Sequence, residues 1–314
     1  MAKRRRVLIL GLPYFGRMLA GVLNRRGWRA TFLDHPGRNV RGWLGIGREL
    51  LRADVLYLIS ARVDKRAPQA WLLRLRRRPT VIHWVGTDVL IALEEQAKGN
   101  VPGYVANAAT HWCDAPWLAN ELAEMGIVAE YQPLPVPGVV MSEAPSLPDK
   151  FHVLLYLPED AFDREVFDME TLLRLPSAFP DVQFTLLPSR RESLPGTLPP
   201  NLETPGWVGD MEQLYRETTL MVRLTSHDGT SFMALECLSR GRYVIWTYPF
   251  PGAIEASGFD AVREAIAELV SRHAEGTLPL NDAGMSHVRA TFAPGTLEEQ
   301  INQRLRRLRR RRIR

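Results

Sequence analysis

Short apolar runs alternate with segments of helical spacing in the first part of the chain. The apolar runs have the length of buried strands and lie at residues 7–10, 30–33, 54–59, 80–85 and 111–114. The segments with helical spacing are 18–26, 67–78, 89–97, 101–109 and 115–125, and several of them end at a glycine or a proline, which stop helices. Apolar strands separated by helices predict a parallel sheet that is covered on both faces.

A proline-rich break follows this alternation. Residues 133–138 contain three prolines and a glycine, which cannot continue a helix and favour an extended linker. The alternation then starts again, with expected strands at 153–156, 182–187, 220–224 and 243–246 and expected helices at 166–179, 211–217, 231–240 and 259–273.

The fold class is therefore expected to be α/β, with two doubly wound, Rossmann-like domains that face each other across a cleft. We place the N-terminal domain at 1–142 and the C-terminal domain at 150–292. Residues 295–314 are expected to form a basic C-terminal helix, for which a return to the N-terminal domain is one placement. Sheets of this kind bind ligands beyond the carboxyl ends of their strands, and two of them together form a cleft.

Composition leaves this picture unchanged. The 314 residues are 46% hydrophobic and 24% charged, which is the ordinary balance of a globular protein. No apolar stretch approaches the roughly 18 residues that a membrane span needs. Cys113 and Cys237 have neither a zinc spacing nor a disulfide framework, so we expect buried thiols, a cytoplasmic protein and no metal.

The charge distribution is more informative than the net charge of +5. Arginines crowd the first hundred positions and the segment Arg304–Arg314. Such asymmetry predicts an anionic partner, and an anionic membrane surface contacted through Arg304–Arg314 would place the protein on the inner face of the membrane. The alternative is a solvated tail in a chain that uses little lysine. Nucleic acid is not expected as a partner, because no known nucleic-acid-binding module is present.

One segment of the second half carries the candidate chemistry. A buried strand at 220–224 is followed by Asp228-Gly229 and then by a helix in which Glu236 stands eight positions after the aspartate. A helix that begins near Ser231 directs unpaired N–H groups and its positive end toward a diphosphate. Gly229 permits close approach of the backbone, and a carboxylate on the helix can accept hydrogen bonds from ribose hydroxyls. The alternative is an ordinary turn with Asp228 as an N-cap and Glu236 as a surface charge.

Residues 205–251 as a whole resemble the donor-binding half of retaining GT-B glycosyltransferases, particularly family 4. That resemblance implies transfer of a sugar from a nucleotide-diphosphate sugar to an acceptor hydroxyl with retention of configuration, without a metal or a further cofactor. Glu236 would then hold the ribose and Asp228 the sugar. The backbone amides expected to face the phosphates are those of Gly229, Thr230, Ser231 and Phe232.

Two segments of the N-terminal half extend the resemblance. The loop from Gly11 to Gly16 stands where the family has a glycine loop beside the donor sugar and the acceptor, which implies an acceptor-side Gly11 and a donor-side Gly16. The segment from His83 to Asp88 resembles the family's Trp-Gly-Ser/Thr-Asp strand end, which implies a catalytic His83 and an acceptor-side Asp88. A core histidine is the alternative for His83. A nicotinamide-dependent oxidoreductase is not favoured, because the loop lacks G-x-G-x-x-G although Asp34 lies where a ribose-binding acid would.

The chain departs from the family in two places. Asp228 stands where the family has a glutamate, and the family's glycine-arginine and lysine after the first strand of the donor domain are absent. Glu159 and Asp160 bring negative charge there instead. The cations that could replace the missing pair are Arg164, Arg190 and Arg191.

A diphosphate leaving group needs electrostatic stabilisation, so two hypotheses stay open. The first is a glycosyltransferase that acts on a glycan or a lipid-linked acceptor. The second is a non-catalytic GT-B-like partner protein that binds a nucleotide or a glycan.

Overall fold

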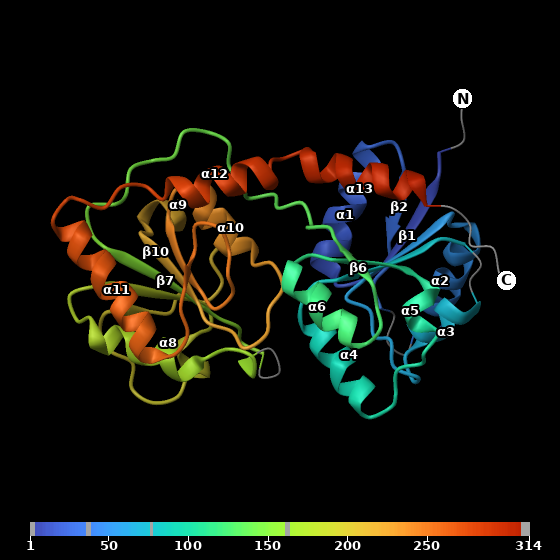
Figure 1. Ribbon diagram of the computed structural model, residues 1–314, viewed down its shortest axis with the longest axis horizontal. Helices are drawn as coiled ribbons and strands as arrows, with labels where there is room; N and C mark the ends of the chain where they lie inside the picture. Colours follow the sequence, from blue (N-terminus) through green and yellow to red (C-terminus); the bar gives the residue numbers. More distant parts are fainter. Residues whose placement is uncertain (1–3, 36–38, 76–77, 161–163, 309–314) are drawn as a thin grey trace. The chain divides into compact units, whose positions relative to one another are not determined.

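The computed structural model describes residues 4–35, 39–75, 78–160 and 164–308. The chain divides into two compact units (Figure 1). Unit 1 consists of Met1–Pro135 together with Pro294–Arg314, and unit 2 is Val136–Ala293. The segment 136–142, which the sequence places in the first domain, therefore belongs to unit 2, and the C-terminal segment belongs to unit 1. None of the helices within the described ranges has the length and apolar character to span a membrane.

Unit 1 contains a six-stranded sheet in which every neighbouring pair is parallel. The strand order is β2-β1-β3-β4-β5-β6. The strands are β1 (Arg6–Gly11), β2 (Arg29–Phe32), β3 (Val55–Ile59), β4 (Thr80–Trp84), β5 (Thr110–Cys113) and β6 (Ala129–Tyr131). The chain leaves β1 toward one edge and returns to β3 on its other side, so the topological switch point lies between β1 and β3.

Helices cover both faces of this sheet. One face packs against α1 (Pro13–Arg25) and α13 (Thr296–Arg307), which bury Leu19, Leu23, Ile301 and Leu305 against the strands. The other face carries α2 (Val40–Arg52), α3 (Pro68–Leu75), α4 (Thr87–Ala97), α5 (Val105–Ala108) and α6 (Pro116–Glu124).

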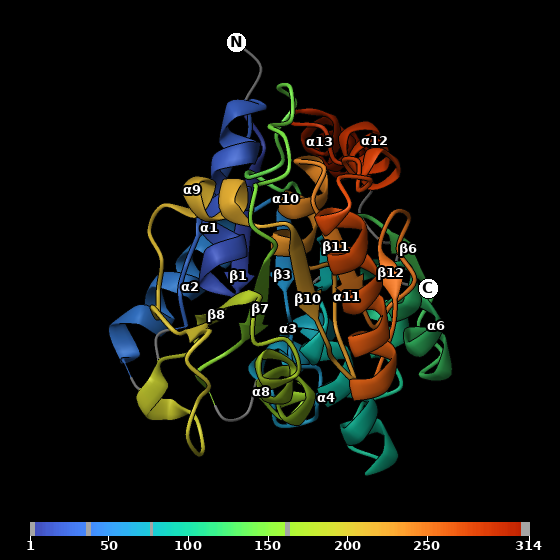
Figure 2. The ribbon, with the colours of Figure 1, turned by 90° about the vertical axis from the view of Figure 1, so that its left-hand side faces the viewer.

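Unit 2 contains a second parallel sheet of six strands, in the order β12-β11-β10-β7-β8-β9. The strands are β7 (His152–Leu157), β8 (Gln183–Pro188), β9 (Leu202–Glu203), β10 (Leu220–Arg223), β11 (Tyr243–Trp246) and β12 (Ile254–Glu255). Helices α8 (Met169–Ala178) and α11 (Phe259–Ala274) pack on one face (Figure 2). The remaining helical elements of the described part are the 3₁₀ turn η1 (Arg191–Ser193), α9 (Met211–Glu217), α10 (Phe232–Ser239) and α12 (Asp282–Thr291).

The predicted α/β class with two doubly wound sheets is confirmed by these topologies. Six elements of the described part have no counterpart in the prediction: α2, α12, β6, β9, β12 and the turn η1. The three strands are only two or three residues long, too short to produce a period. Helix α2 contains three glycines, which are poor helix formers, and this composition hides its helical spacing.

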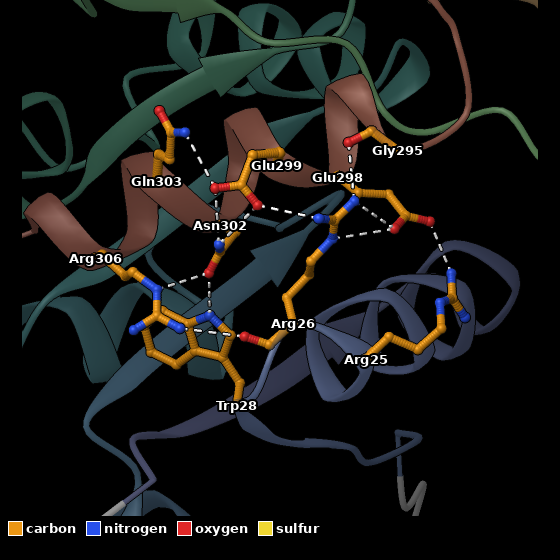
Figure 3. A network of polar contacts seen from close by, with 9 residues as sticks. All are labelled: Arg25, Arg26, Trp28, Gly295, Glu298, Glu299, Asn302, Gln303 and Arg306. Atoms are coloured by element: carbon orange, nitrogen blue, oxygen red, sulfur yellow. Dashed lines mark hydrogen bonds and ion pairs between the residues drawn. The ribbon is translucent and has the colours of Figure 1, made fainter. Parts of the chain in front are cut away.

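Helix α13 is attached to unit 1 by a polar network at its first two turns (Figure 3). The Arg26 guanidinium donates to Glu298 and Glu299 and to the carbonyl of Gly295, and Arg25 donates to the other oxygen of Glu298 at 2.8 Å. Acidic residues in the first turn of a helix also interact favourably with its dipole. The network therefore fixes the start of α13 against α1.

The second half of the network is built around the buried pair Trp28 and Asn302. The Trp28 indole N–H donates to Asn302 Oδ1 at 2.9 Å, and Arg306 Nε donates to the same oxygen at 2.9 Å. Arg306 also lies over the Trp28 ring and donates to the carbonyl of Arg26. Arg304 pairs with Glu130 at 3.1 Å. Two of the C-terminal arginines thus hold the helix to its own unit.

Replacing Asn302 with alanine is expected to lower the free energy of unfolding by about 1–3 kcal/mol, because it leaves the buried indole N–H of Trp28 without an acceptor. Gln303→Ala is the matched control, since Gln303 is exposed and contacts the network only through Glu299. That control should shift stability by no more than about 0.5 kcal/mol. Urea unfolding followed by tryptophan fluorescence measures both, and equal effects would contradict the importance of the buried bond.

Candidate functional site

The topological switch point of unit 2 lies between β7 and β10. From β7 the chain proceeds outward to β8 and β9, and then returns to β10 on the other side of β7. The loops that follow these two strands diverge at that point, and the carboxyl ends of the strands there are the usual ligand position of such sheets. The loop after β10 contains the predicted residues from Asp228 to Ser231, and the loop after β7 leads to Arg164.

Asp228 is held by an arginine that the sequence did not single out. Arg223, the last residue of β10, donates from Nε to Asp228 Oδ2 at 2.5 Å and from Nη2 to Oδ1 at 2.8 Å. Both side chains are about nine-tenths buried, and the Trp246 indole N–H donates to Oδ2 at 3.3 Å. This bidentate pair fixes the turn after β10, which gives Asp228 a role in shaping the loop.

The loop that Asp228 shapes ends at the start of α10. The Ser231 hydroxyl accepts a hydrogen bond from the backbone N–H of Ala234, so Ser231 is the N-cap. Upstream, Ser226 N donates to the carbonyl of Val166, and Thr225 N donates to the Thr247 hydroxyl. The loop is thus held from both sides by the neighbouring connections of unit 2, with the N-terminus of α10 at the carboxyl edge of the sheet.

Glu236 lies on the next turn of α10 and is not an ordinary surface charge. The Tyr215 hydroxyl, from α9, donates a short hydrogen bond to Glu236 Oε2. Gly138 lies directly against the carboxylate, and a Cβ at this position would overlap Glu236 Oε1. Burial raises the pKa of the Glu236 carboxyl, while the hydrogen bond from Tyr215 and the charge of Arg240 oppose that rise. Glu236 therefore has a fixed orientation and a half-buried carboxylate.

The surroundings of Glu236 are organised by Arg240. Arg240 is 4% exposed, and its guanidinium donates to Glu212 at 2.6 Å and to the backbone carbonyls of Gly138 and Glu236, both at 2.9 Å. It lies over the ring of Tyr215, 4.7 Å from the ring centroid. One buried cation therefore joins the linker, α9 and α10.

Two more arginines hold the segment that follows this linker, residues 142–146. Arg242, which is fully buried, donates to the carbonyls of Pro145 and Ser146, and Arg289 donates to the carbonyl of Ser142 at 2.7 Å. Hydrogen bonds from a guanidinium to backbone carbonyls satisfy polar groups that burial would otherwise penalise. These bonds explain why the chain after Pro135 belongs to unit 2.

Arg164 lies at the same carboxyl edge and is rigidly held. It donates to the carbonyls of Pro158 and Ser193, both at 2.7 Å, and to the hydroxyls of Ser189 and Ser193. All four acceptors are uncharged, so the guanidinium keeps its full positive charge. Arg190 is exposed instead and lies 3.7 Å from Glu159, in a pair that solvent screens.

The two predicted glycines of unit 1 lie at tight contacts. Gly11 ends β1 with φ +126°, and a Cβ there would overlap the carbonyl oxygen of Ile59 at the end of β3. Gly11 thus permits the close approach of the chain at the switch point of unit 1. Gly16 lies on α1, where a Cβ would overlap the ring of Phe32. This contact gives Gly16 a packing role between helix and strand, and leaves no room for a ligand beside its Cα.

His83 and Asp88 are both buried in unit 1. His83 is 0% exposed, and its Nδ1 lies 2.6 Å from the Tyr57 hydroxyl. Burial lowers the pKa of His83 to about 3, so the imidazole is neutral at physiological pH. This environment supports the core-histidine alternative. Asp88 accepts a hydrogen bond from the backbone N–H of Val85 at 3.0 Å, and burial raises the pKa of its carboxyl to about 7.

The described residues contain no group of three or more His, Cys, Asp and Glu side chains that could hold a metal ion. Within unit 2, the fold gathers Asp228, Gly229, Thr230, Ser231 and Phe232 on one loop and helix start, with Glu236 on the same helix. The residues that sequence reasoning missed are Gly138, Tyr215, Arg223 and Arg240. The position of Gly138 directly after three closely spaced prolines is a local signal that could have indicated its role. Tyr215, Arg223 and Arg240 lie in no such local pattern.

Comparisons with known proteins support the fold and not a family. No family model matches the chain, and no curated protein matches its sequence. Among solved structures, sucrose-phosphate synthase from Thermosynechococcus elongatus is similar at a TM-score of 0.69 and 14% identity, with 96% of this chain and 98% of that chain covered. The glycosyltransferase SnogD from Streptomyces nogalater is similar at a TM-score of 0.55 and 17% identity, with 97% and 99% covered.

A third solved structure adds a ligand to this set. The pneumococcal O-GlcNAc transferase GtfA, in complex with UDP and GlcNAc, is similar at a TM-score of 0.55 and 10% identity, with 80% of this chain and 56% of that chain covered. At these identities the similarity shows the fold alone. The chain therefore has the GT-B fold of these glycosyltransferases, as the sequence predicted.

The raised pKa of Glu236 predicts a specific pH dependence. The folded state keeps a proton on this carboxyl to a higher pH than the unfolded chain, in which it titrates near 4.5. The free energy of unfolding should therefore fall as pH rises from about 4.5 through the folded pKa. Glu236→Gln removes this loss, so the stability of the variant relative to wild type should increase as the pH rises above about 4.5.

Denaturant unfolding at a series of pH values measures the effect. Glu170→Gln is the control, because the Glu170 side chain is 81% exposed on α8. Curves for Glu236→Gln and wild type that run parallel across this range would contradict the burial of the carboxyl.

Proposed function

We propose that the protein is a glycosyltransferase that moves a sugar from a nucleotide-diphosphate sugar to an acceptor hydroxyl. The observation that carries the proposal is the fixed position of Glu236 on α10, at the carboxyl edge of unit 2. It occurs in a chain whose fold matches a solved sucrose-phosphate synthase over 96% of its length. A carboxylate held on this helix, whose N-terminus lies at the carboxyl edge of the sheet, suits a nucleoside diphosphate.

The donor would bind at the carboxyl edge of the sheet of unit 2 as follows. Glu236 accepts hydrogen bonds from the ribose, and its contact with Gly138 and the bond from Tyr215 keep it in one orientation. The amides of Gly229, Thr230, Ser231 and Phe232 face the phosphates at the start of α10. Asp228 acts through Arg223, by holding the loop that presents these amides. A structural neighbour contains bound UDP, so nucleoside diphosphates are the first ligands to test.

Arg164 supplies the positive charge that the sequence lacks at the family's usual positions. It is fixed by four hydrogen bonds to neutral groups at the carboxyl ends of β7 and β8. A preorganised cation of this kind stabilises the charge that develops on a leaving diphosphate without reorganising during the reaction. Arg190 is the second candidate cation, although Glu159 competes for it.

Retention of configuration, independence of metal and membership of family 4 belong to the same proposal through the resemblance of residues 205–251. The transition state would be oxocarbenium-like, as in glycoside hydrolysis. Catalysis would then consist of positioning the donor and stabilising the diphosphate. Unit 1 would provide the acceptor side through Gly11 and Asp88. A lipid-linked acceptor fits the excess of arginine in this unit.

Calorimetry with UDP, GDP and ADP tests the nucleotide site. We expect one of these nucleotides to bind wild type and Glu236→Ala to abolish measurable binding, because the ribose loses its acceptor. A wild-type protein that binds none of the three would remove the basis of the proposal. Gly138→Ala should weaken binding about tenfold or more, since the new Cβ displaces the Glu236 carboxylate. Gly209→Ala is the matched control, because no atom lies within 4 Å of a Cβ there.

Arg164→Met should weaken binding of the nucleoside diphosphate by about tenfold to a hundredfold, which is the value of a charge-assisted hydrogen bond. Binding of the corresponding nucleoside should change much less, because it carries no phosphate. Arg272→Met, on the exposed side of α11, is the charge-matched control. An equal loss of nucleoside and diphosphate binding would mean that Arg164 only supports the loops.

A further inference from the structure

Helix α2 carries an exposed apolar stripe. Val40, Leu44 and Leu51 are 70%, 69% and 79% exposed. Their spacing of four and seven residues places them on one side of the helix. A different side packs on the sheet, through the buried Ile46 and the partly buried Leu50. The exposed stripe is therefore separate from the face that α2 uses for folding.

A basic stripe runs beside the apolar one. Arg41, Arg48 and Arg52 have spacings of seven and four residues, so they too share one side of the helix, next to Leu44 and Leu51. Arg48 and Arg52 both lie near Glu49, at 3.5 and 3.2 Å. Three arginines against one glutamate leave α2 with a net charge of +2. Exposed pairs such as these contribute little and release their arginines readily to another anion.

We propose that α2 is a membrane-docking helix, which lies in the surface of an anionic lipid bilayer. Val40, Leu44 and Leu51 would enter the boundary between headgroups and acyl chains, and the arginines would contact the lipid phosphates. A helix with an apolar stripe, a neighbouring row of arginines and low overall hydrophobicity has the character of an interfacial helix. Arginine suits this place because its stem can lie along apolar surface while its charged end reaches the phosphates.

The features of α2 favour a bilayer over a protein partner. Gly45 and Gly47 have no atom within 4 Å of the position of a Cβ, so nothing in the described chain packs on α2 at these two positions. The adjacent arginines are complementary to anionic headgroups. By contrast, Arg304 and Arg306 are already engaged with Glu130, Asn302 and Trp28 in unit 1. Only the role of docking rests on the proposed function: docking would bring the enzyme to a lipid-linked acceptor.

Flotation with phosphatidylcholine vesicles, with and without phosphatidylglycerol, tests the docking without donor or acceptor. Wild type should bind the anionic vesicles about tenfold or more tightly than the neutral ones. Leu44→Ser/Leu51→Ser should lose about tenfold or more of that binding, and Arg41→Gln/Arg48→Gln/Arg52→Gln should lose the preference for anionic lipid. Val128→Ser is the matched control, because Val128 is 87% exposed elsewhere in unit 1. Thermal unfolding verifies that all variants fold.

A label on α2 locates the contact directly. Both native cysteines are buried, so Leu44→Cys can carry a single environment-sensitive fluorophore, with Val128→Cys as its control. The emission of the label at position 44 should shift to the blue on anionic vesicles, and that at position 128 should not.

Three results would overturn the proposal. The first is wild-type flotation that Leu44→Ser/Leu51→Ser does not reduce, and the second is a label at position 44 that stays in water. The third is a dimer that this double substitution dissociates, which would mean that a second copy covers α2. Because nucleotide binding is measured separately, failure of docking leaves the assignment of the donor site untouched.

Discussion

The hydrogen bonds of the buried Arg240 guanidinium are the interactions on which the geometry of the candidate nucleotide site depends. A buried charge is costly unless it is paired and fully hydrogen-bonded, and Arg240 meets this condition only when three pieces of chain converge on it. Glu212 provides the counter-charge, Gly138 and Glu236 provide carbonyls, and Tyr215 provides a ring. The convergence brings the linker onto α10 and the tyrosine hydroxyl onto the carboxylate. The orientation of Glu236 thus follows from the contacts that satisfy the hydrogen-bonding groups of Arg240, one turn later on the helix.

Local sequence patterns were sufficient for most of the fold. Buried parallel strands produce continuous apolar runs, and glycines and prolines mark where helices stop, so the longer strands of both sheets and most helices could be predicted. The same holds for the loop from Asp228 to Ser231, whose chemistry is contained in adjacent residues. Helix α2 was not predicted, because its glycines and its exposed leucines break the amphipathic pattern on which such predictions depend.

The partners of the site residues could not be predicted in this way. Arg223 is five positions from Asp228 and across a turn, and Tyr215 lies 21 positions before Glu236 on another helix. Which arginine meets which carboxylate depends on register and packing, and the sequence offers many arginines to choose from. Several arginines have partners that the sequence did not indicate. Arg26, Arg242 and Arg306 look like surface charge in the sequence, yet they donate to backbone carbonyls or to groups within their own unit.

The discontinuity of unit 1 has a consequence for how the protein is made. Unit 2 is an insertion between β6 and α13. The ribosome therefore synthesises all of residues 136–293 before it synthesises α13, the helix that covers β1. During that interval Val7, Ile9 and Trp112 lack the part of their cover that Ile301 and Leu305 provide. Exposed apolar surface of this kind favours aggregation of nascent chains. Unit 2 can therefore fold before unit 1 is complete. A chain that ends anywhere within unit 2 lacks α13, so its unit 1 keeps part of the sheet uncovered.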